Sequence, residues 1–315
     1  MPTDTQTRVH APSPGPGQTA EAKRLLHLVT WASVGTATFL VVLKLYAWSA
    51  TDSISLLATL VDSLLDVGAS LVTFVAVRQA LVPPDREHRF GHGKAEPLAA
   101  LAQSAFITGS ALFLLVEAIG RLFAPEPLQD PEVGYAVMGI AIGVTLALTL
   151  FQGYVARRTG SLAITADRLH YTSDLLVNAA VICALFVVDS LAWPAADPII
   201  ALAIGSFILY TAYGLAHSAL DMLLDRELPD RQRQKIKTEL EATPTLKGWH
   251  DLRTRASGPQ IFVQLHIELD GTMPLAESHR IAEDLEYRIA EALGQAEVII
   301  HQDPYPDAGA HPPAS

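Results

Sequence analysis

The sequence predicts an α-helical polytopic membrane protein with six transmembrane helices, followed by a small C-terminal α+β domain of ferredoxin-like type. Three observations lead to this fold class. Half of the 315 residues are hydrophobic and only 17% are charged, which gives a mean hydropathy of +0.28. Several apolar runs are long enough to cross roughly 30 Å of hydrocarbon. A charged pattern typical of a soluble domain follows the last run.

The apolar runs lie at about 26–49, 54–77, 98–123, 133–155, 161–188 and 198–220. Lysines and arginines gather in the N-terminal tail, in the second and fourth connections and after the sixth run, whereas the first and fifth connections carry none. Positive charge concentrates in cytoplasmic loops. We therefore expect both termini to lie in the cytoplasm.

The composition divides the chain into four parts. We expect a disordered cytoplasmic tail over 1–24, the transmembrane domain over 25–222, a cytoplasmic domain over 223–304 and a disordered tail over 305–315. The order of elements in the soluble part is α-β-β-α-β, with a helix, two strands around a Ser-Gly-Pro turn, an amphipathic helix and a third strand. This order predicts one small α+β domain. The elements are expected at 230–242, 250–255, 260–269, 275–293 and 296–301.

Ionisable residues interrupt two of the apolar runs in pairs. Asp62 and Asp66 stand at i and i+4 in the second run, and His170 and Asp174 have the same spacing in the fifth. Such residues cost at least ~2.5 kcal/mol each on insertion scales, so each needs a partner or a function. At a rise of ~1.5 Å per residue, all four lie near the middle of the membrane. The pairs are therefore expected to face one another.

Three carboxylates and one imidazole form a ligand set that suits tetrahedral Zn²⁺ and also accepts Fe²⁺, Mn²⁺, Co²⁺ or Cd²⁺. The single cysteine, Cys183, excludes a thiolate cage and a disulfide framework. Two alternatives remain open, namely hydrogen-bonded pairs that only hold helices together and a proton relay without metal. Closer to the cytoplasm, Asp167 and Arg168 are expected to form an ion pair at the entrance of the fifth helix.

Other histidines gather outside the membrane. The loop between the second and third runs contains Asp85, His88 and His92, for which solvated loop residues are the alternative interpretation. In the soluble domain, strand and helix periodicity directs several side chains away from the apolar core. Scattered surface residues are the alternative there. These side chains are His250, His266, His279, His301 and Asp303.

Four motifs resemble those of the cation diffusion facilitator family, most closely its bacterial zinc and ferrous-iron efflux members. They are Leu60–Asp66 (LVDSLLD), Phe90–Glu96 (FGHGKAE), Leu169–Asp174 (LHYTSD) and His301–Pro304 (HQDP), and the resemblance covers nearly the whole chain. It implies a homodimer in the bacterial cytoplasmic (inner) membrane that exchanges protons for metal by alternating access.

The resemblance also assigns roles to the residues singled out above. It implies a transport site at Asp62, Asp66, His170 and Asp174. A second, peripheral metal site would use Asp85, His88 and His92. A binuclear zinc site, structural or regulatory, is implied at the contact between cytoplasmic domains, formed by His250, His266, His279, His301 and Asp303. Lys94 and Asp225 would form an ion pair at the dimer hinge.

Other functional classes fit the sequence less well. The net charge of −11 and the lack of a concentrated basic face argue against nucleic acid as a partner. The sequence has no H-E-x-x-H helix or nucleophile motif, which argues against an enzyme. A metal-free carrier or channel would not need the histidine-rich domain, and a metal sensor would not need six spans. We therefore expect a secondary active transporter of divalent metal ions, above all Zn²⁺, in the lipid bilayer. The resemblance implies protons and a second copy of the chain as its further partners.

Overall fold

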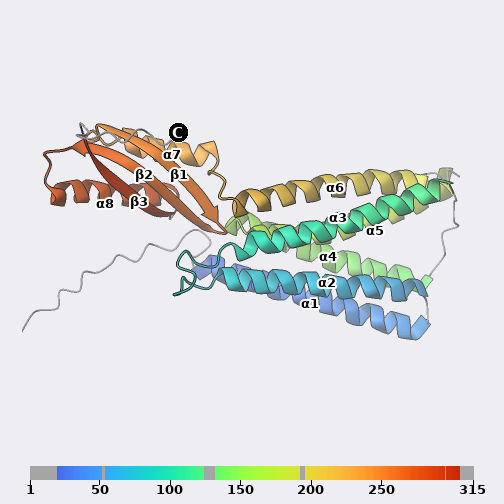
Figure 1. Ribbon diagram of the computed structural model, residues 1–315. Helices are drawn as coiled ribbons and strands as arrows, with labels where there is room; N and C mark the ends of the chain where they lie inside the picture. Colours follow the sequence, from blue (N-terminus) through green and yellow to red (C-terminus); the bar gives the residue numbers. More distant parts are fainter. Residues whose placement is uncertain (1–19, 52–53, 124–131, 192–195, 295, 306–315) are drawn as a thin grey trace, which may run out of the picture. The chain divides into compact units, whose positions relative to one another are not determined.

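The computed structural model describes residues 20–51, 54–123, 132–191, 196–294 and 296–305 (Figure 1). Within the helices, the side chains of 50–51, 54–59, 61–62, 121, 132–138, 181–182, 184–191 and 196–197 lie outside this description. The chain forms two compact units. The first comprises Ala20–Leu224, and the second begins at Asp225.

The first unit consists of helices that run side by side (Figure 1). Each contains 27 to 32 residues, which corresponds to roughly 40 Å or more and is enough to cross a bilayer. The predicted six-helix architecture is therefore confirmed. The helices are α1 (Ala20–Thr51), α2 (Ile54–Ala80), α3 (Ala95–Phe123), α4 (Glu132–Thr159), α5 (Leu162–Leu191) and α6 (Ala196–Leu223).

The surface of these helices is apolar, as a lipid environment requires. Within the described residues, α1, α2, α3, α4 and α6 each contain a segment long and apolar enough to span a membrane. Large apolar side chains point outward along them, and Phe113 and Tyr210 are each 74% exposed. The first half of α5 is more polar because it carries Asp167, Arg168 and Asp174. This helix therefore places two carboxylates, Asp167 and Asp174, and the imidazole of His170 within the bundle.

Small residues allow the helices to approach closely. The most extensive helix contact joins α3 and α6, and alanines at 100, 111, 212 and 219 lie in the core between them. At Gly205 of α6, an added Cβ would lie 2.9 Å from Cδ2 of Leu115 in α3. Interfaces between membrane helices are rich in such residues because packing, and not burial from water, holds the helices together.

The second unit is a three-stranded sheet with two helices. Its elements are α7 (Asp230–Glu241), β1 (Gly248–Ser257), β2 (Gln260–Asp270), α8 (Leu275–Ala292) and β3 (Ala296–Tyr305). β2 lies in the centre and pairs antiparallel with β1 and parallel with β3. The predicted α-β-β-α-β order is confirmed. β3 extends beyond the predicted strand because its pairing with β2 continues to Asp270 and Tyr305.

One face of this sheet carries the core of the unit. Val263, Leu265, Ile267 and Leu269 of β2 are at most 2% exposed, and they pack in one cluster with residues of α7 and α8 that include Leu285. Because side chains alternate along a strand, the intervening residues of β2 point to the opposite face. The polar residues Gln264, His266 and Glu268 are accordingly exposed or half-buried.

Candidate metal sites

The first site lies within the helical bundle, where α2 faces α5. His170 Nε2 lies 3.0 Å from Asp66 Oδ1 and 3.9 Å from Asp174 Oδ2. The imidazole is buried, with 5% of the residue exposed, while the Asp66 and Asp174 side chains are 15% and 42% exposed. The structure thus brings together three of the four side chains singled out in these helices. Asp62 lies one turn earlier in α2, and its side chain is outside the described residues.

Neighbouring residues fix the orientation of this group. The hydroxyls of Tyr171 and Ser70 share a hydrogen bond of 2.7 Å between α5 and α2, next to the ligand candidates in both helices. The ring of Phe106 in α3 lies 5.5 Å from the His170 ring, centroid to centroid. Lys44 of α1 donates to Ser63 of α2 at 2.7 Å. The imidazole is therefore held by contacts from two other helices.

A cavity of about 760 Å³ adjoins the group. Its lining includes Asp66, His170 and Asp174, together with polar side chains from the other helices such as Lys44 and Glu117. Ligands around a tetrahedral Zn²⁺ at ~2.0–2.1 Å stand roughly 3.3 Å apart. The separations of 3.0 and 3.9 Å bracket that value. The spacing of the donor atoms therefore suits a small divalent ion.

Asp167 and Arg168 do not form the ion pair expected from the sequence. Asp167 is fully buried and accepts a hydrogen bond of 2.7 Å from Gln152 Nε2 of α4. Arg168 is exposed, and its guanidinium lies against Gly153. Neighbouring residues on a helix point in different directions, so an i, i+1 pair cannot meet. The sequence interpretation missed that Asp167 belongs to the interior of the bundle.

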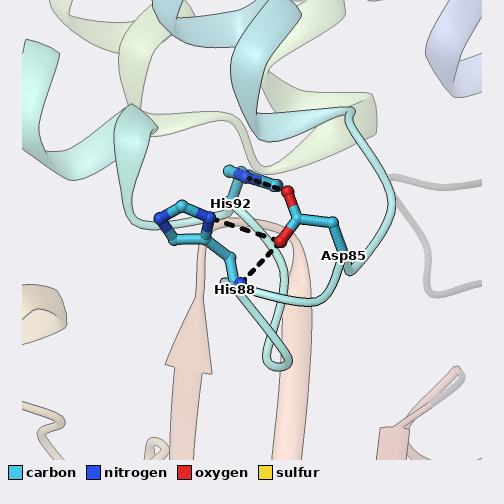
Figure 2. A group of neighbouring side chains, drawn as sticks. All are labelled: Asp85, His88 and His92. Carbon is cyan, nitrogen blue, oxygen red and sulfur yellow. Dashed lines mark hydrogen bonds and ion pairs between the residues drawn. The ribbon is translucent and has the colours of Figure 1, made fainter.

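The second site is the loop between α2 and α3 (Figure 2). Asp85 lies between two imidazoles, with Oδ1 at 3.4 Å from His88 Nδ1 and Oδ2 at 3.4 Å from His92 Nε2. The two rings lie 4.5 Å apart, centroid to centroid. All three residues singled out in this loop therefore converge, and their spacing also fits a tetrahedral ion.

Backbone hydrogen bonds in the loop orient the Asp85 carboxylate and favour its ionised form. Oδ1 of Asp85 accepts hydrogen bonds from the backbone N–H of His88 at 2.6 Å and of Glu87 at 2.9 Å. Chiefly through the bond from His88, these contacts lower the pKa of Asp85 below its usual 3.8. Gly91 has a φ of 78°, a conformation that glycine adopts without strain, and it turns the chain back to place His92 beside Asp85. The carboxylate thus stays ionised and available as a ligand.

The third site lies on the open face of the sheet in the second unit. Strand register pairs His250 of β1 with His266 of β2, and His266 with His301 of β3. The three rings form a row, with centroids 4.9 and 4.6 Å apart. Asp303 lies two residues beyond His301, so it points to the same face.

The carboxylate of Asp303 lies close to all three imidazoles of this row. Its Oδ2 lies 2.8 Å from His266 Nδ1 and 3.4 Å from His250 Nε2, and its Oδ1 lies 3.3 Å from His301 Nε2. His279 is not part of the group. It is exposed on α8, which packs on the apolar face of the sheet, and none of its described hydrogen bonds or ion pairs reaches the row.

The sequence interpretation missed two acidic neighbours of this row. Asp251 Oδ2 lies 3.4 Å from His250 Nδ1, and Glu268 Oε1 lies 3.9 Å from His250 Nε2. Asp251 has a φ of 50°, at a point where the pairing register of β1 shifts. Such a bulge redirects side chains, and a single sequence does not reveal it. The alternation of β2 could have drawn attention to Glu268, which shares the face of His266.

Lys94 and Asp225 belong to different units, so their predicted pairing remains a prediction. Within the first unit, Lys94 Nζ donates to the carbonyl oxygen of Leu223 at 3.2 Å. Within the second unit, Asp225 forms an ion pair with Arg255 at 3.3 Å. Both residues thus have local roles at the junction in the chain between α6 and the second unit.

Glu96 has a structural role that the sequence did not indicate. Its carboxylate is 1% exposed and accepts hydrogen bonds from Ser161 Oγ at 2.8 Å and from the backbone N–H of Leu162 at 3.0 Å. These donors stand at the beginning of α5, where backbone N–H groups lack partners in the helix. Glu96 therefore ties the first turn of α3 to the helix that carries His170.

The comparisons with known proteins cover both units. The family model for the cation efflux transmembrane domain matches residues 30–224, and the model for the cation efflux protein cytoplasmic domain matches residues 228–305. The chain belongs to the cation efflux family, also called the cation diffusion facilitators. The resemblance of its motifs to this family is thus confirmed.

Curated relatives in the family support this assignment. The chain is 49% identical over 284 residues to the cation-efflux pump FieF of Serratia proteamaculans, covering 89% of this chain and 93% of that protein. It is also 49% identical over 281 residues to FieF of Klebsiella pneumoniae, with the same coverage. A solved structure, the metal-bound C-terminal domain of the CzcD transporter from Thermotoga maritima, is 24% identical, covers 25% of this chain and 93% of that chain, and has a TM-score of 0.24.

The family assignment fixes the general activity of this member. It is a membrane transporter that exports divalent metal cations, and it is not an enzyme. Metal ions are its transported substrates, and its long apolar helices cross a lipid bilayer.

Proposed function

We propose that this transporter exports divalent transition-metal ions, Zn²⁺ foremost and also Fe²⁺ and Cd²⁺, in exchange for protons across the bacterial inner membrane. The observation that carries this proposal is the group of Asp66, His170 and Asp174, whose donor atoms lie within 4.8 Å of one another inside the bundle. The group adjoins a cavity, as a transport site must. Asp62, one turn away in α2, would supply a fourth ligand.

The ligand types favour transition metals over the harder cations. Mg²⁺ and Ca²⁺ are bound by oxygen ligands alone and would not need His170. Zn²⁺ accepts one imidazole with several carboxylates, and Fe²⁺ and Cd²⁺ accept a similar set.

Proton exchange follows from the chemistry of the same atoms. His170 Nε2 and Asp66 Oδ1 stand 3.0 Å apart, so without metal they share a proton in a hydrogen bond. A metal ion requires neutral imidazole and ionised carboxylate, so its binding displaces that proton. If the site opens alternately to the two sides of the membrane, proton entry drives metal exit.

The remaining features complete the proposal. Both termini would lie in the cytoplasm, in line with the distribution of positive charge. The row formed by His250, His266, His301 and Asp303 would hold structural or regulatory zinc in a homodimer. His279, which lies outside the row, stays a ligand that the resemblance to the family implies. The loop group of Figure 2 would bind a further ion at the end of the bundle where α2 ends and α3 begins.

The test is metal flux into proteoliposomes that contain a trapped fluorescent indicator, recorded with and without a pH gradient. Zn²⁺, Fe²⁺, Cd²⁺ and Mg²⁺ are compared for the native chain, Asp66→Asn and His170→Ala. We expect gradient-driven flux of the first three ions, and its loss in both variants. His217→Ala is the matched control, because His217 forms an i, i+4 pair with Asp221 at 3.6 Å on α6, away from the cavity lining.

Each component of the proposal can fail separately. Native flux that ignores the pH gradient would exclude proton exchange while leaving metal export in place. Flux that survives both Asp66→Asn and His170→Ala would remove this group as the transport site. Equal flux of Mg²⁺ and Zn²⁺ would contradict the proposed selectivity.

A further inference from the structure

A buried polar network lies beside the transport group and is not explained by metal binding. Gln152 Nε2 of α4 donates both to Asp167 Oδ2 of α5, at 2.7 Å, and to Ser33 Oγ of α1, at 3.0 Å. Gln103 of α3 donates to Thr73 of α2, and its side chain also faces Asp167. All five residues are at most 4% exposed. The network therefore joins the interior faces of five helices.

The network and the cavity lie on opposite sides of the transport group. We call the end of the bundle at which α1, α3 and α5 begin the near end. On α5, Asp167 lies one turn closer to the near end than His170, a step of roughly 4.5 Å. On α1, Ser33 lies closer to that end than Leu40, the first cavity residue of the helix. The cavity residues described on α5 run from His170 to Asn178, away from the near end.

The other three helices show the same order. α2 and α4 run toward the near end, so residues later in these helices lie closer to it. Thr73 follows the cavity residue Asp66 in α2, and Gln152 follows the cavity residue Thr145 in α4. Gln103 precedes Ala105, where the cavity lining of α3 begins. On all five helices, the network therefore lies between the cavity and the near end.

An apolar cluster lies between the network and the near end. Leu26, Val29, Val77, Val155 and Ile164 are at most 1% exposed and pack together from α1, α2, α4 and α5. Each lies closer to the near end than the network residue of its own helix. Water and ions at the near end thus meet a packed apolar layer and then a fully buried layer of hydrogen bonds before the transport group.

We propose that Asp167, Gln152 and Ser33 form a latch that closes the transport site toward the near end, and that the latch must open for the site to change sides. Asp167 is then a positioning residue and not a metal ligand. It holds α5, the helix of His170 and Asp174, to α1 and α4. The link between this latch and transport rests on the proposed function. The closure itself does not, because it is a property of the packed helices.

Because the latch depends on hydrogen-bond geometry, it predicts different effects for different substitutions. Asp167→Asn retains an oxygen that accepts from Gln152, so it should keep the latch. Asp167→Ala removes the acceptor and leaves a buried donor without a partner, which weakens the closed state. Ser33→Ala removes the α1 end of the latch and is the milder variant. Thr30→Val is the matched control, because the bonds of this buried α1 hydroxyl within the described part of the chain go only to backbone carbonyls of its own helix, at 2.9 and 3.1 Å.

Closure can be measured without transport, by labelling a reporter cysteine. Cys183, the single native cysteine, is changed to serine, and Val155→Cys places a thiol of similar size in the apolar layer one turn from Gln152. The full chain in proteoliposomes is then treated with a maleimide. We expect Asp167→Ala and Ser33→Ala to raise the labelling rate roughly tenfold and a few-fold, respectively. Asp167→Asn and Thr30→Val should label at the native rate.

The outcomes separate the latch from its alternatives. Unchanged labelling in Asp167→Ala and Ser33→Ala would overturn the latch, even if metal flux is confirmed. If Asp167→Asn abolishes flux as fully as Asp167→Ala without a change in labelling, Asp167 acts through its charge and is not a positioning residue. Faster labelling in a chain that shows no metal flux would sustain the latch while removing the proposed function. Ser33→Ala keeps the test decisive if Asp167→Ala fails to fold.

Discussion

Replacement of Glu96 is expected to weaken the start of α5. The carboxylate accepts bonds of 2.8 Å from Ser161 Oγ and 3.0 Å from the N–H of Leu162, and the residue is 1% exposed. It therefore acts as a helix cap supplied by another helix. Loss of a capping acceptor costs about 0.5–2 kcal/mol, and loss of a negative charge at a partly buried helix N-terminus costs up to about 2 kcal/mol. The two effects share the same bonds, so we expect about 2 kcal/mol for Glu96→Ala.

Glu96→Gln separates the two contributions. The glutamine amide keeps an acceptor oxygen of similar shape but removes the charge, so we expect a cost of about 1 kcal/mol or less. The assay is thermal unfolding of the detergent-solubilised protein, followed by circular dichroism. At roughly 2–4 °C per kcal/mol for a unit of this size, Glu96→Ala should lower Tm by about 4–8 °C and Glu96→Gln by less.

Glu87→Ala provides the control for this comparison. Glu87 is an exposed residue of the preceding loop, and its contact with Asp85 uses the backbone N–H, which alanine retains. The Tm of the Glu87→Ala variant should stay near that of the native chain. The reasoning is refuted if Glu96→Ala unfolds at the native temperature. A glutamine variant as unstable as the alanine variant would show that charge, and not the shape of the cap, stabilises α5.

Three further predictions concern packing, metal affinity and pH. Gly205→Ala should lower Tm because its Cβ would press on α3, whereas Gly214→Ala, with no atom within 4 Å of the added Cβ, should leave Tm unchanged or raise it. Asp303→Asn should weaken zinc binding in the second unit, measured by calorimetry, by at least the roughly 10–100-fold that is typical for loss of an outer-shell partner, and the exposed Asp270→Asn should not. Burial raises the pKa of Glu286 above 4.5, so the folded state takes up a proton at a higher pH than the unfolded state does. The contribution of Glu286 to the free energy of unfolding should therefore increase as pH falls through the raised pKa. Glu286→Gln should remove that increase in denaturant titrations at several pH values.

The sequence by itself determined the membrane unit, the order of elements in the second unit and most members of the candidate sites. Length and hydropathy identify helices because the hydrocarbon core has a fixed thickness. Spacing at i, i+4 places His170 and Asp174 on one helix face, and alternation turns His266 away from the apolar core. These properties are local and periodic, so they can be derived directly from the order of residues.

Contacts between distant segments were decided only by the tertiary structure. Strand register brings His250, His266 and His301 into one row and leaves His279 on another face of the unit. The packing of α4 against α5 buries Asp167 and gives it Gln152 as a partner, in place of the predicted ion pair with its neighbour. Such contacts depend on helix rotation and register, which are set by the combined packing of many side chains. No single run of residues contains that information, so the latch and the cap of α5 could be found only in the folded chain.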